Sequence, residues 1–150
     1  MSTEHILNDF RAKFRIDEFT IYKNNSWTWS LRPAQPTLGA GILSLNRYAL
    51  HLSDVNETEM KDLGQIINVI EKTLKESFQY DIMNYLMLMM VDHHVHYHVI
   101  PRYKENKLFG ELLWLDNGWP GVPVIADNQH KENPDILNKM FLKLKENIHL

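Results

Sequence analysis

Apolar residues recur along the chain with two different periods, and these periods predict its helices and strands. Spacings of three and four residues are typical of amphipathic helices, whereas alternation is typical of strands. The helical spacing occurs in three stretches, which are residues 7–14, 56–78 and 133–148. Alternating or continuously apolar residues occur in shorter stretches, which are residues 19–22, 27–31, 38–45, 81–91, 92–100 and 108–115.

The predicted helices carry recognisable start signals and apolar faces. Asn56 is a good N-cap residue, and Glu59 three positions later completes a capping box. Asn133 followed by Pro134 opens the last helix. The apolar stripe of the long central helix comprises Met60, Leu63, Ile67, Ile70, Leu74 and Phe78. One side of the last helix is lined by Leu137, Met140, Phe141, Leu144 and Ile148. In the first helix, Phe10 and Phe14 lie on the same face.

The strand patterns predict a sheet that packs against these helices. Asn24 and Asn25 mark a turn between the first two strands. Gly39 and Gly41 allow the third strand to approach another backbone closely. Residues 81–91 are almost continuously apolar, so we expect both faces of that strand to be covered. Strands in succession, with helices between them and at the ends, predict an α+β domain with a mostly antiparallel sheet of about five strands, a long helix packed on it and a C-terminal helix.

Three histidines alternate with apolar residues in the segment His94-Val95-His96-Tyr97-His98. In a strand these histidines share one face. Imidazole is partly ionised near neutral pH and acts as both base and nucleophile, so the row indicates chemistry rather than packing. A metal site is an alternative, because the neighbouring rings of His94 and His96 can converge on one zinc ion if a third ligand comes from elsewhere.

The alternating histidines resemble the motif of the histidine triad family of nucleotide hydrolases and transferases. The resemblance covers roughly residues 18–103 and includes Gly39 to Leu45, Arg47-Tyr48 and Pro101-Arg102. It implies a single histidine-triad-like domain over residues 1–150, with residues 104–150 as a C-terminal extension. Within that extension, Trp119-Pro120-Gly121 resembles a bacterial subgroup of the family.

The resemblance implies cleavage at the α-phosphate of a nucleotide conjugate, either a dinucleoside polyphosphate or a nucleoside phosphoramidate. His96 is then the nucleophile that carries the nucleotidyl group, and its second ring nitrogen should donate to a backbone carbonyl. His94 and His98 would orient the ring and bind phosphate oxygens. No metal and no cofactor are implied.

Asn84, Arg47 and Arg102 are candidates to bind the nucleotide. Asn84 is the only polar residue inside an apolar strand and resembles a family residue that faces the nucleotide. A hydrogen bond to a neighbouring backbone group is the alternative for this amide. The arginines present planar forks that suit phosphate. A surface salt bridge is the alternative for each of them.

Arg32 and Trp29 are two further candidates to bind the nucleotide. Arg32 occupies a position where family members often place an asparagine near the ribose. Trp29, together with Trp27 and Phe19, is able to stack on a base. The same three aromatic residues fit equally well in a hydrophobic core.

Three departures from the family pattern bear on function. Residues 88–91 are purely apolar where many members have a Gly-Gln turn, and no serine or glutamine is present there to assist the leaving group. Ala40 stands where some members have another histidine. These departures leave open a non-catalytic nucleotide-binding module or sensor as the second hypothesis.

Composition and charge limit the possible partners. The formal net charge of −3 gives no support to binding a nucleic acid polymer, which usually requires a basic surface. The chain has no cysteine, no recognisable secretory signal and no apolar stretch long enough for a membrane span, so we expect a cytoplasmic protein. One large branch of the histidine triad family forms dimers, and the apolar strand at residues 85–91 needs covering, so we expect a homodimer.

Overall fold

The computed structural model describes residues 3–149 and is built around a five-stranded sheet with strand order β1-β2-β3-β5-β4. All four neighbouring pairs are antiparallel. The strands are β1 (Thr20–Lys23), β2 (Trp27–Leu31), β3 (Gly41–Leu45), β4 (Ile82–Leu86) and β5 (His96–Arg102). The predicted α+β class, with an antiparallel sheet of about five strands, is confirmed.

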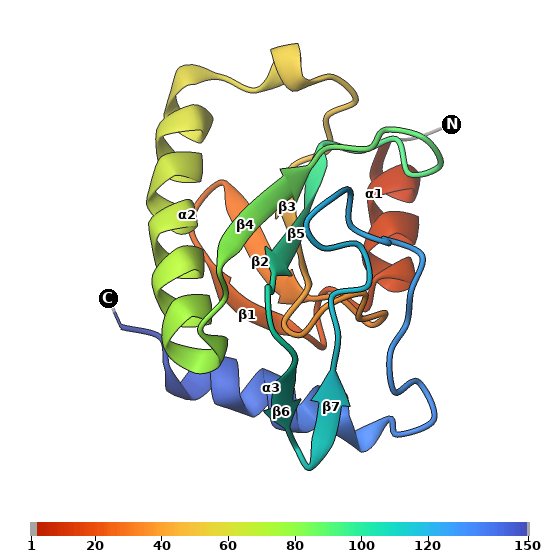
Figure 1. Cartoon of the computed structure of the whole chain (residues 1–150). Helices are drawn as coiled ribbons and strands as arrows, with labels where there is room; N and C mark the ends of the chain where they lie inside the picture. The colour runs from red at the N-terminus through yellow and green to blue at the C-terminus, as the bar shows by residue number, and fades with distance from the viewer. Residues whose placement is uncertain (1–2, 150) are drawn as a thin grey trace.

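Helices cover both faces of the sheet (Figure 1). The long helix α2 (Glu57–Phe78) crosses one face, and α1 (Thr3–Lys13) lies on the other. The C-terminal helix α3 (Asp135–Glu146) runs past one end of the sheet, and a short 3-10 turn η1 (Leu52–Asp54) precedes α2. This arrangement gives the sheet two chemically different faces.

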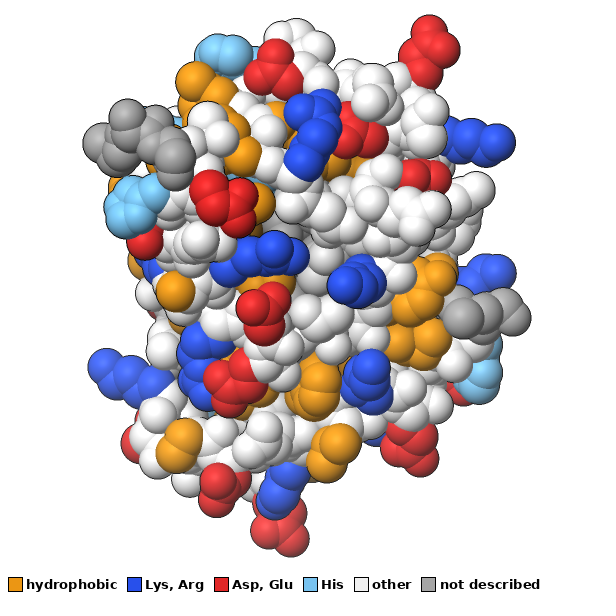
Figure 2. All heavy atoms as spheres, turned by 180° about the vertical axis from the view of Figure 1, so that it is seen from behind, with side chains coloured by type: hydrophobic (Ala, Val, Ile, Leu, Met, Phe, Trp, Pro, Cys, Tyr) orange, Lys and Arg blue, Asp and Glu red, His pale blue; other side chains and the backbone are white. Residues whose placement is uncertain are grey.

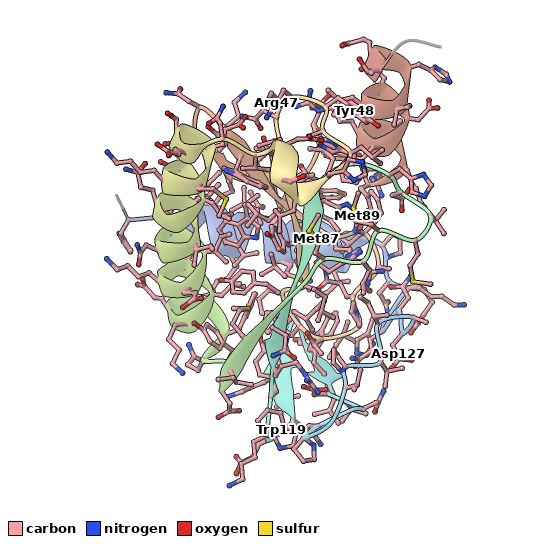
Figure 3. All side chains as sticks on the ribbon, turned by 90° about the horizontal axis from the view of Figure 1, so that it is seen from above. Arg47, Tyr48, Met87, Met89, Trp119 and Asp127 are labelled. Atoms are coloured by element: carbon pink, nitrogen blue, oxygen red, sulfur yellow. The ribbon has the colours of Figure 1, made fainter. Side chains whose placement is uncertain are left out.

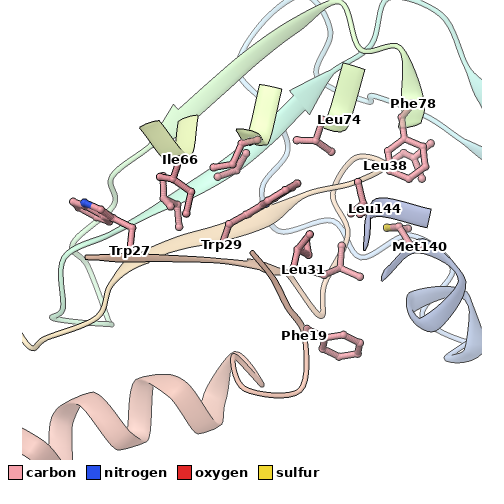
Figure 4. Packing of buried hydrophobic residues seen from close by; sticks show 14 of the residues in the cluster. Phe19, Trp27, Trp29, Leu31, Leu38, Ile66, Leu74, Phe78, Met140 and Leu144 are labelled. Atoms are coloured by element: carbon pink, nitrogen blue, oxygen red, sulfur yellow. The ribbon is translucent and has the colours of Figure 1, made fainter. Parts of the chain in front are cut away.

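The main hydrophobic core lies between the sheet, α2 and α3. Figure 4 shows Trp27 and Trp29 of β2 directed toward α2, on the side of the sheet away from α1. Both tryptophans are fully buried. Met140 and Leu144 of α3 complete this core, so the C-terminal helix packs where its apolar stripe predicted.

The start of α2 has the predicted capping box. The Asn56 side chain accepts a hydrogen bond from the Glu59 amide at 2.9 Å, and the Glu59 carboxylate accepts one from the Asn56 amide at 3.0 Å. Met60 does not belong to the buried stripe, because 47% of its surface is exposed. Ile66 is fully buried instead, since it lies between Leu63 and Ile70 on the helix face that meets the sheet.

The predicted strand over residues 81–91 was too long. β4 ends at Leu86, and residues 87–95 form a connection before β5 begins at His96. The backbone of Val95 instead bonds to Leu45 and Ala49, which draws the chain away from β4. Met90 and Val91 are each 77% exposed, so the expected covering of both faces does not occur within one chain.

Two smaller elements also differ from expectation. Residues 108–115 are not an edge strand of the main sheet but most of a hairpin, β6 (Lys107–Phe109) and β7 (Leu112–Trp114). Gly110 and Glu111 both have positive φ, as a tight two-residue hairpin turn requires. The third strand begins at Gly41 rather than residue 38, because Gly39 adopts a φ of +88° in the preceding turn.

The surface carries charges of both signs. Figure 2 shows basic and acidic side chains interspersed over the face seen from behind. Among residues 3–149, no helix is both long enough and apolar enough to cross a bilayer.

Candidate active site

The three histidines gather on the sheet face that α1 covers. His96 and His98 alternate with Tyr97 along β5 and therefore point to the same face. His94 lies in the bend just before β5 rather than within the strand. All three side chains are buried, with exposed fractions of 0% for His94, 1% for His96 and 7% for His98.

Two aromatic rings of α1 pack on the histidines. The Phe10 ring lies 5.1 Å from the His94 ring and 5.0 Å from the His96 ring, measured between centroids. The Phe14 ring lies 6.2 Å from both the His96 and the His98 rings. The shared face of Phe10 and Phe14 predicted from their spacing therefore covers the triad.

His94 is held in one neutral tautomer by the backbone around it. Its Nε2 donates to the Leu45 carbonyl at 2.8 Å, and its Nδ1 accepts from the Ala49 amide at 3.3 Å. The Tyr48 ring stacks on it at 5.8 Å with an interplanar angle of 20°. Both ring nitrogens are thus engaged, and His94 fixes the end of β3 against the start of β5.

His96 has one ring nitrogen occupied and one available. Its Nδ1 donates to the His94 carbonyl at 2.5 Å. The hydrogen bond to a backbone carbonyl expected for the nucleophile is therefore present. Its Nε2 is buried and has no hydrogen-bond partner, which leaves the lone pair of the neutral ring free. The His98 ring lies beside it, 5.2 Å away in an edge-on arrangement.

Burial lowers the pKa of all three histidines. The effect is largest at His98, where burial and the positive charge of Arg32 lower the pKa to about 4. Loss of hydration disfavours imidazolium in such a site. The triad is consequently uncharged near neutral pH, which suits a nucleophile but leaves it without positive charge for phosphate oxygens.

Arg102 and Asn84 are brought together at the other end of β5. The Arg102 guanidinium forms a bidentate pair with Asp116, with its Nε 2.8 Å from Oδ2, and also donates to the Asn84 side chain at 2.9 Å. The Arg102 and Asp116 side chains are only 4% and 1% exposed. This network ties β4 and β5 to the C-terminal extension, on which Trp119 also lies (Figure 3).

The structure does not bring Arg47 or Trp29 to the triad. Arg47 pairs with Glu59 at 2.7 Å near the start of α2, which is the salt-bridge arrangement weighed as its alternative. Trp29 is fully buried on the α2 face, opposite the histidines (Figure 4). A base bound beside His96 would lie on the other side of the sheet from this ring.

Arg32 lies on the triad face. Its guanidinium acts electrostatically on His98 and donates to the Ile125 carbonyl at 3.1 Å. This contact joins the loop after β2 to the C-terminal extension. Burial lowers the pKa of the Arg32 guanidinium from its ordinary value.

A cavity of about 280 Å³ opens beside the triad, between α1 and the segment 91–94. His94 and Phe10 line it, whereas His96 and His98 do not. Lys13 of α1 closes its rim by pairing with both oxygens of Asp92 at 2.9 Å. Ligand pockets usually measure about 300–1,000 Å³, so this cavity is small for a nucleotide.

Sequence reasoning missed several residues that shape the site. The spacing of Phe10 and Phe14 predicts that they share one helix face, but it does not say which surface that face covers. Tyr48 lies within the segment that resembles the family, but its sequence position alone does not indicate that its ring stacks on His94. The pair Lys13–Asp92 joins residues 79 positions apart, so no local pattern reveals it.

The model of the HIT domain family matches residues 13–105, which include all three histidines. The chain belongs to this family. The recognition from the alternating histidines is therefore confirmed.

Curated relatives from Saccharomyces cerevisiae are named bis(5′-adenosyl)-triphosphatase. One of them is 28% identical over 131 residues, which cover 81% of this chain. The chain spans 62% of the length of that relative.

Solved structures of the family share the fold. A histidine triad protein from Bradyrhizobium japonicum is 20% identical, with a TM-score of 0.68 over 90% of this chain and 95% of that chain. One from Sinorhizobium meliloti is 18% identical, with a TM-score of 0.66 over 89% and 93%. A zinc-bound family protein from Mycobacterium smegmatis is 18% identical, with a TM-score of 0.55 over 92% and 95%.

Proposed function

We propose that this protein is a nucleotidyl hydrolase or transferase that attacks the α-phosphorus of a nucleotide conjugate through His96. The observation that carries the proposal is the His96 ring itself. Its Nδ1 is fixed as a donor by the His94 carbonyl, and its buried Nε2 has no partner. A neutral imidazole held in this way presents a lone pair without repelling an anionic phosphate.

The reaction proceeds in two displacements. In the first, the Nε2 lone pair forms a phosphorus–nitrogen bond, and the bond from phosphorus to the leaving group breaks with its electron pair going to that group. In the second, water or another acceptor attacks phosphorus, loses a proton and releases Nε2 as a lone pair. The Nδ1–H donated to the His94 carbonyl stabilises the positive charge that the ring carries in between.

Two classes of nucleotide conjugate fit this chemistry, namely dinucleoside polyphosphates and nucleoside phosphoramidates. The name of the yeast relatives supports the first class. Because Phe10 and Phe14 pack on the histidines, α1 must move before a phosphate reaches Nε2. The small cavity beside α1 is the place where such a movement would admit a ligand.

The test is turnover by the variant His96→Ala. We expect it to abolish cleavage of diadenosine triphosphate and adenosine 5′-phosphoramidate while circular dichroism stays unchanged. His149→Ala is the matched control, since that histidine is exposed and lies beside Glu76 at the surface. If His96→Ala keeps about a tenth of wild-type turnover or more, His96 is not the nucleophile.

A nucleotide-binding module without turnover is the second candidate. The observation that favours it is the closed site, in which the attacking nitrogen is inaccessible beneath α1. A panel of adenylylated and guanylylated compounds separates the two candidates. Binding of several compounds without cleavage of any would favour the module.

A metal site at His94 and His96 has less support. Both ring nitrogens of His94 already have backbone partners, so metal binding there would cost a hydrogen bond. We therefore expect activity to survive treatment with a chelator. Activity that disappears and returns with added zinc would favour the metal hypothesis instead.

A further inference from the structure

We propose that Arg32 forms a second anion subsite beside His98, and that the favoured substrates carry a second phosphate in addition to the α-phosphate that His96 attacks. This inference rests on the proposed function. The second phosphate has two possible sources, the leaving group or the ribose of the nucleotide.

The position of Arg32 follows from the strand register. Its amide donates to the Ala40 carbonyl at 3.0 Å, which extends the pairing of β2 and β3 by one step. Ser30 pairs with Ile42, and Ile42 pairs with His98. Because side chains alternate along a strand, Arg32 points to the same face as Ser30, two residues before it, and therefore to the face of His98.

The residue between Arg32 and β5 is small. Ile42 faces His98 and Gly41 faces Val99, so Ala40 comes level with the residue after Val99 on β5. Because Ala40 has only a methyl side chain, it leaves room for the Arg32 side chain to extend across β3 toward His98. The electrostatic effect of Arg32 on His98 is consistent with this approach.

Arg32 differs from the other arginines because it lacks a counterion. Four arginines lie within 4.0 Å of a carboxylate, and these pairs are Arg11–Asp17, Arg15–Glu18, Arg47–Glu59 and Arg102–Asp116. In the part of the chain that the structure describes, the Arg32 guanidinium has no such partner and donates only to the Ile125 carbonyl. Its Nε is buried and unpartnered.

A partly buried cation without a counterion is costly unless it serves an anion that binds there. Isolated charges lose favourable hydration on burial, which is why they are normally paired. The lowered pKa of the Arg32 guanidinium has the same cause. An incoming phosphate would offset this cost by pairing with the guanidinium fork.

The rest of the site cannot supply that charge. Burial keeps the three histidines neutral, and the nearby cation Lys13 is already paired with Asp92. Arg11 also acts on His94, but it pairs with Asp17 at 3.9 Å. Among the described residues, Arg32 is thus the arginine beside the triad that has no counterion. A substrate with a single phosphate at His96 would leave this charge uncompensated.

The experiment compares three compounds on the same enzyme. Adenosine 5′-phosphoramidate has one phosphate, diadenosine triphosphate adds phosphate on the leaving side, and the 3′-phosphorylated phosphoramidate adds it on the ribose. We expect Arg32→Gln to lower kcat/KM by about tenfold or more for one of the two-phosphate compounds, and by about twofold or less for the one-phosphate compound. The two-phosphate compound whose kcat/KM falls in Arg32→Gln identifies the source of the second phosphate.

Two further variants make the result specific. Arg15→Gln removes a surface arginine that pairs with Glu18 and should change none of the three values. Arg32→Lys keeps the charge but loses the fork, so we expect an intermediate loss on the affected compound. Should Arg32→Gln fail to fold, the loss of kcat/KM in Arg32→Lys decides the question. A variant that lowers kcat/KM equally for all three compounds overturns the subsite.

Binding of inorganic pyrophosphate, measured by calorimetry, separates the subsite from the proposed function. If no compound is turned over but Arg32→Gln weakens pyrophosphate binding and Arg15→Gln does not, the subsite stands and the proposed function fails. If turnover depends on His96 but neither turnover nor pyrophosphate binding depends on Arg32, the subsite is overturned and the proposed function stands.

Discussion

At the residue scale, two glycines provide a matched pair with opposite expected effects. A Cβ at Gly41 would lie 2.8 Å from Trp29 Nε1 and 2.8 Å from the Ser30 carbonyl oxygen, closer than atoms pack. A Cβ at Gly64, on the exposed side of α2, would meet nothing within 4 Å. We expect Gly41→Ala to destabilise the fold by about 1–3 kcal/mol and Gly64→Ala to stabilise it by about 0.5–1 kcal/mol. Urea unfolding of both variants measures this, and a neutral Gly41→Ala would contradict the close packing of Trp29.

The buried histidines predict how stability depends on pH. His98 has a pKa of about 4 in the folded protein, whereas an unfolded histidine titrates near 6.5. Between these values the unfolded chain binds more protons, so the free energy of unfolding falls as pH drops from about 6.5 to about 4. His98→Gln removes this contribution. We expect wild-type protein to lose more stability than the variant between about pH 7.5 and 5. Equal losses would mean that His98 is not buried as a neutral ring.

Among the helices, α1 covers His96, and the proposed function requires this helix to move before a ligand reaches Nε2. The partly exposed pair Lys13–Asp92, at the edge of the cavity beside α1, holds this helix against the triad. Such pairs contribute about 0.2–1 kcal/mol, so Lys13→Gln should increase the open fraction and raise kcat/KM by about twofold.

Hydrogen exchange in residues 3–13 should increase in the same variant. Glu18→Gln is the control, because it breaks the exposed pair with Arg15 at the surface. Faster exchange in α1 without any change in kcat/KM would show that α1 does not limit access.

At the scale of the whole molecule, the open edge of the sheet favours a homodimer. β4 is an edge strand, and Ile82, Met90 and Val91 are all more than half exposed. The C-terminal extension does not cover this region, because its Asp116 binds at the Arg102 end of β5 and Met90 and Val91 stay exposed. We expect sedimentation at micromolar concentration to give a single species of twice the 17.8 kDa chain mass.

A double variant tests which surface forms the dimer. Met90→Lys with Val91→Lys places two charges on the exposed apolar segment and should give monomers. Leu142→Lys, at another exposed apolar position on α3, should leave the dimer intact. Wild-type protein that sediments near the mass of one chain would rule out the homodimer.

The local elements and the histidine row can be read from the amino-acid sequence. Caps, turn residues and periodic apolar positions act within a few residues, so α2, β2 and α3 lie close to where the pattern placed them. The triad was recognisable for the same reason, because three histidines in alternation occupy a short segment.

The partner of each buried face depends on the folded arrangement of the whole chain. Periodicity predicts that a face is buried but not which partner it packs against. In the structure, Trp29 lies on the α2 side of the sheet and Phe10 packs on the triad. The partner of Arg102 lies 14 residues away, and that of Lys13 lies 79 away. The missing counterion of Arg32 is likewise a property of the folded chain, since pairing between distant charges depends on their separation in space rather than in sequence.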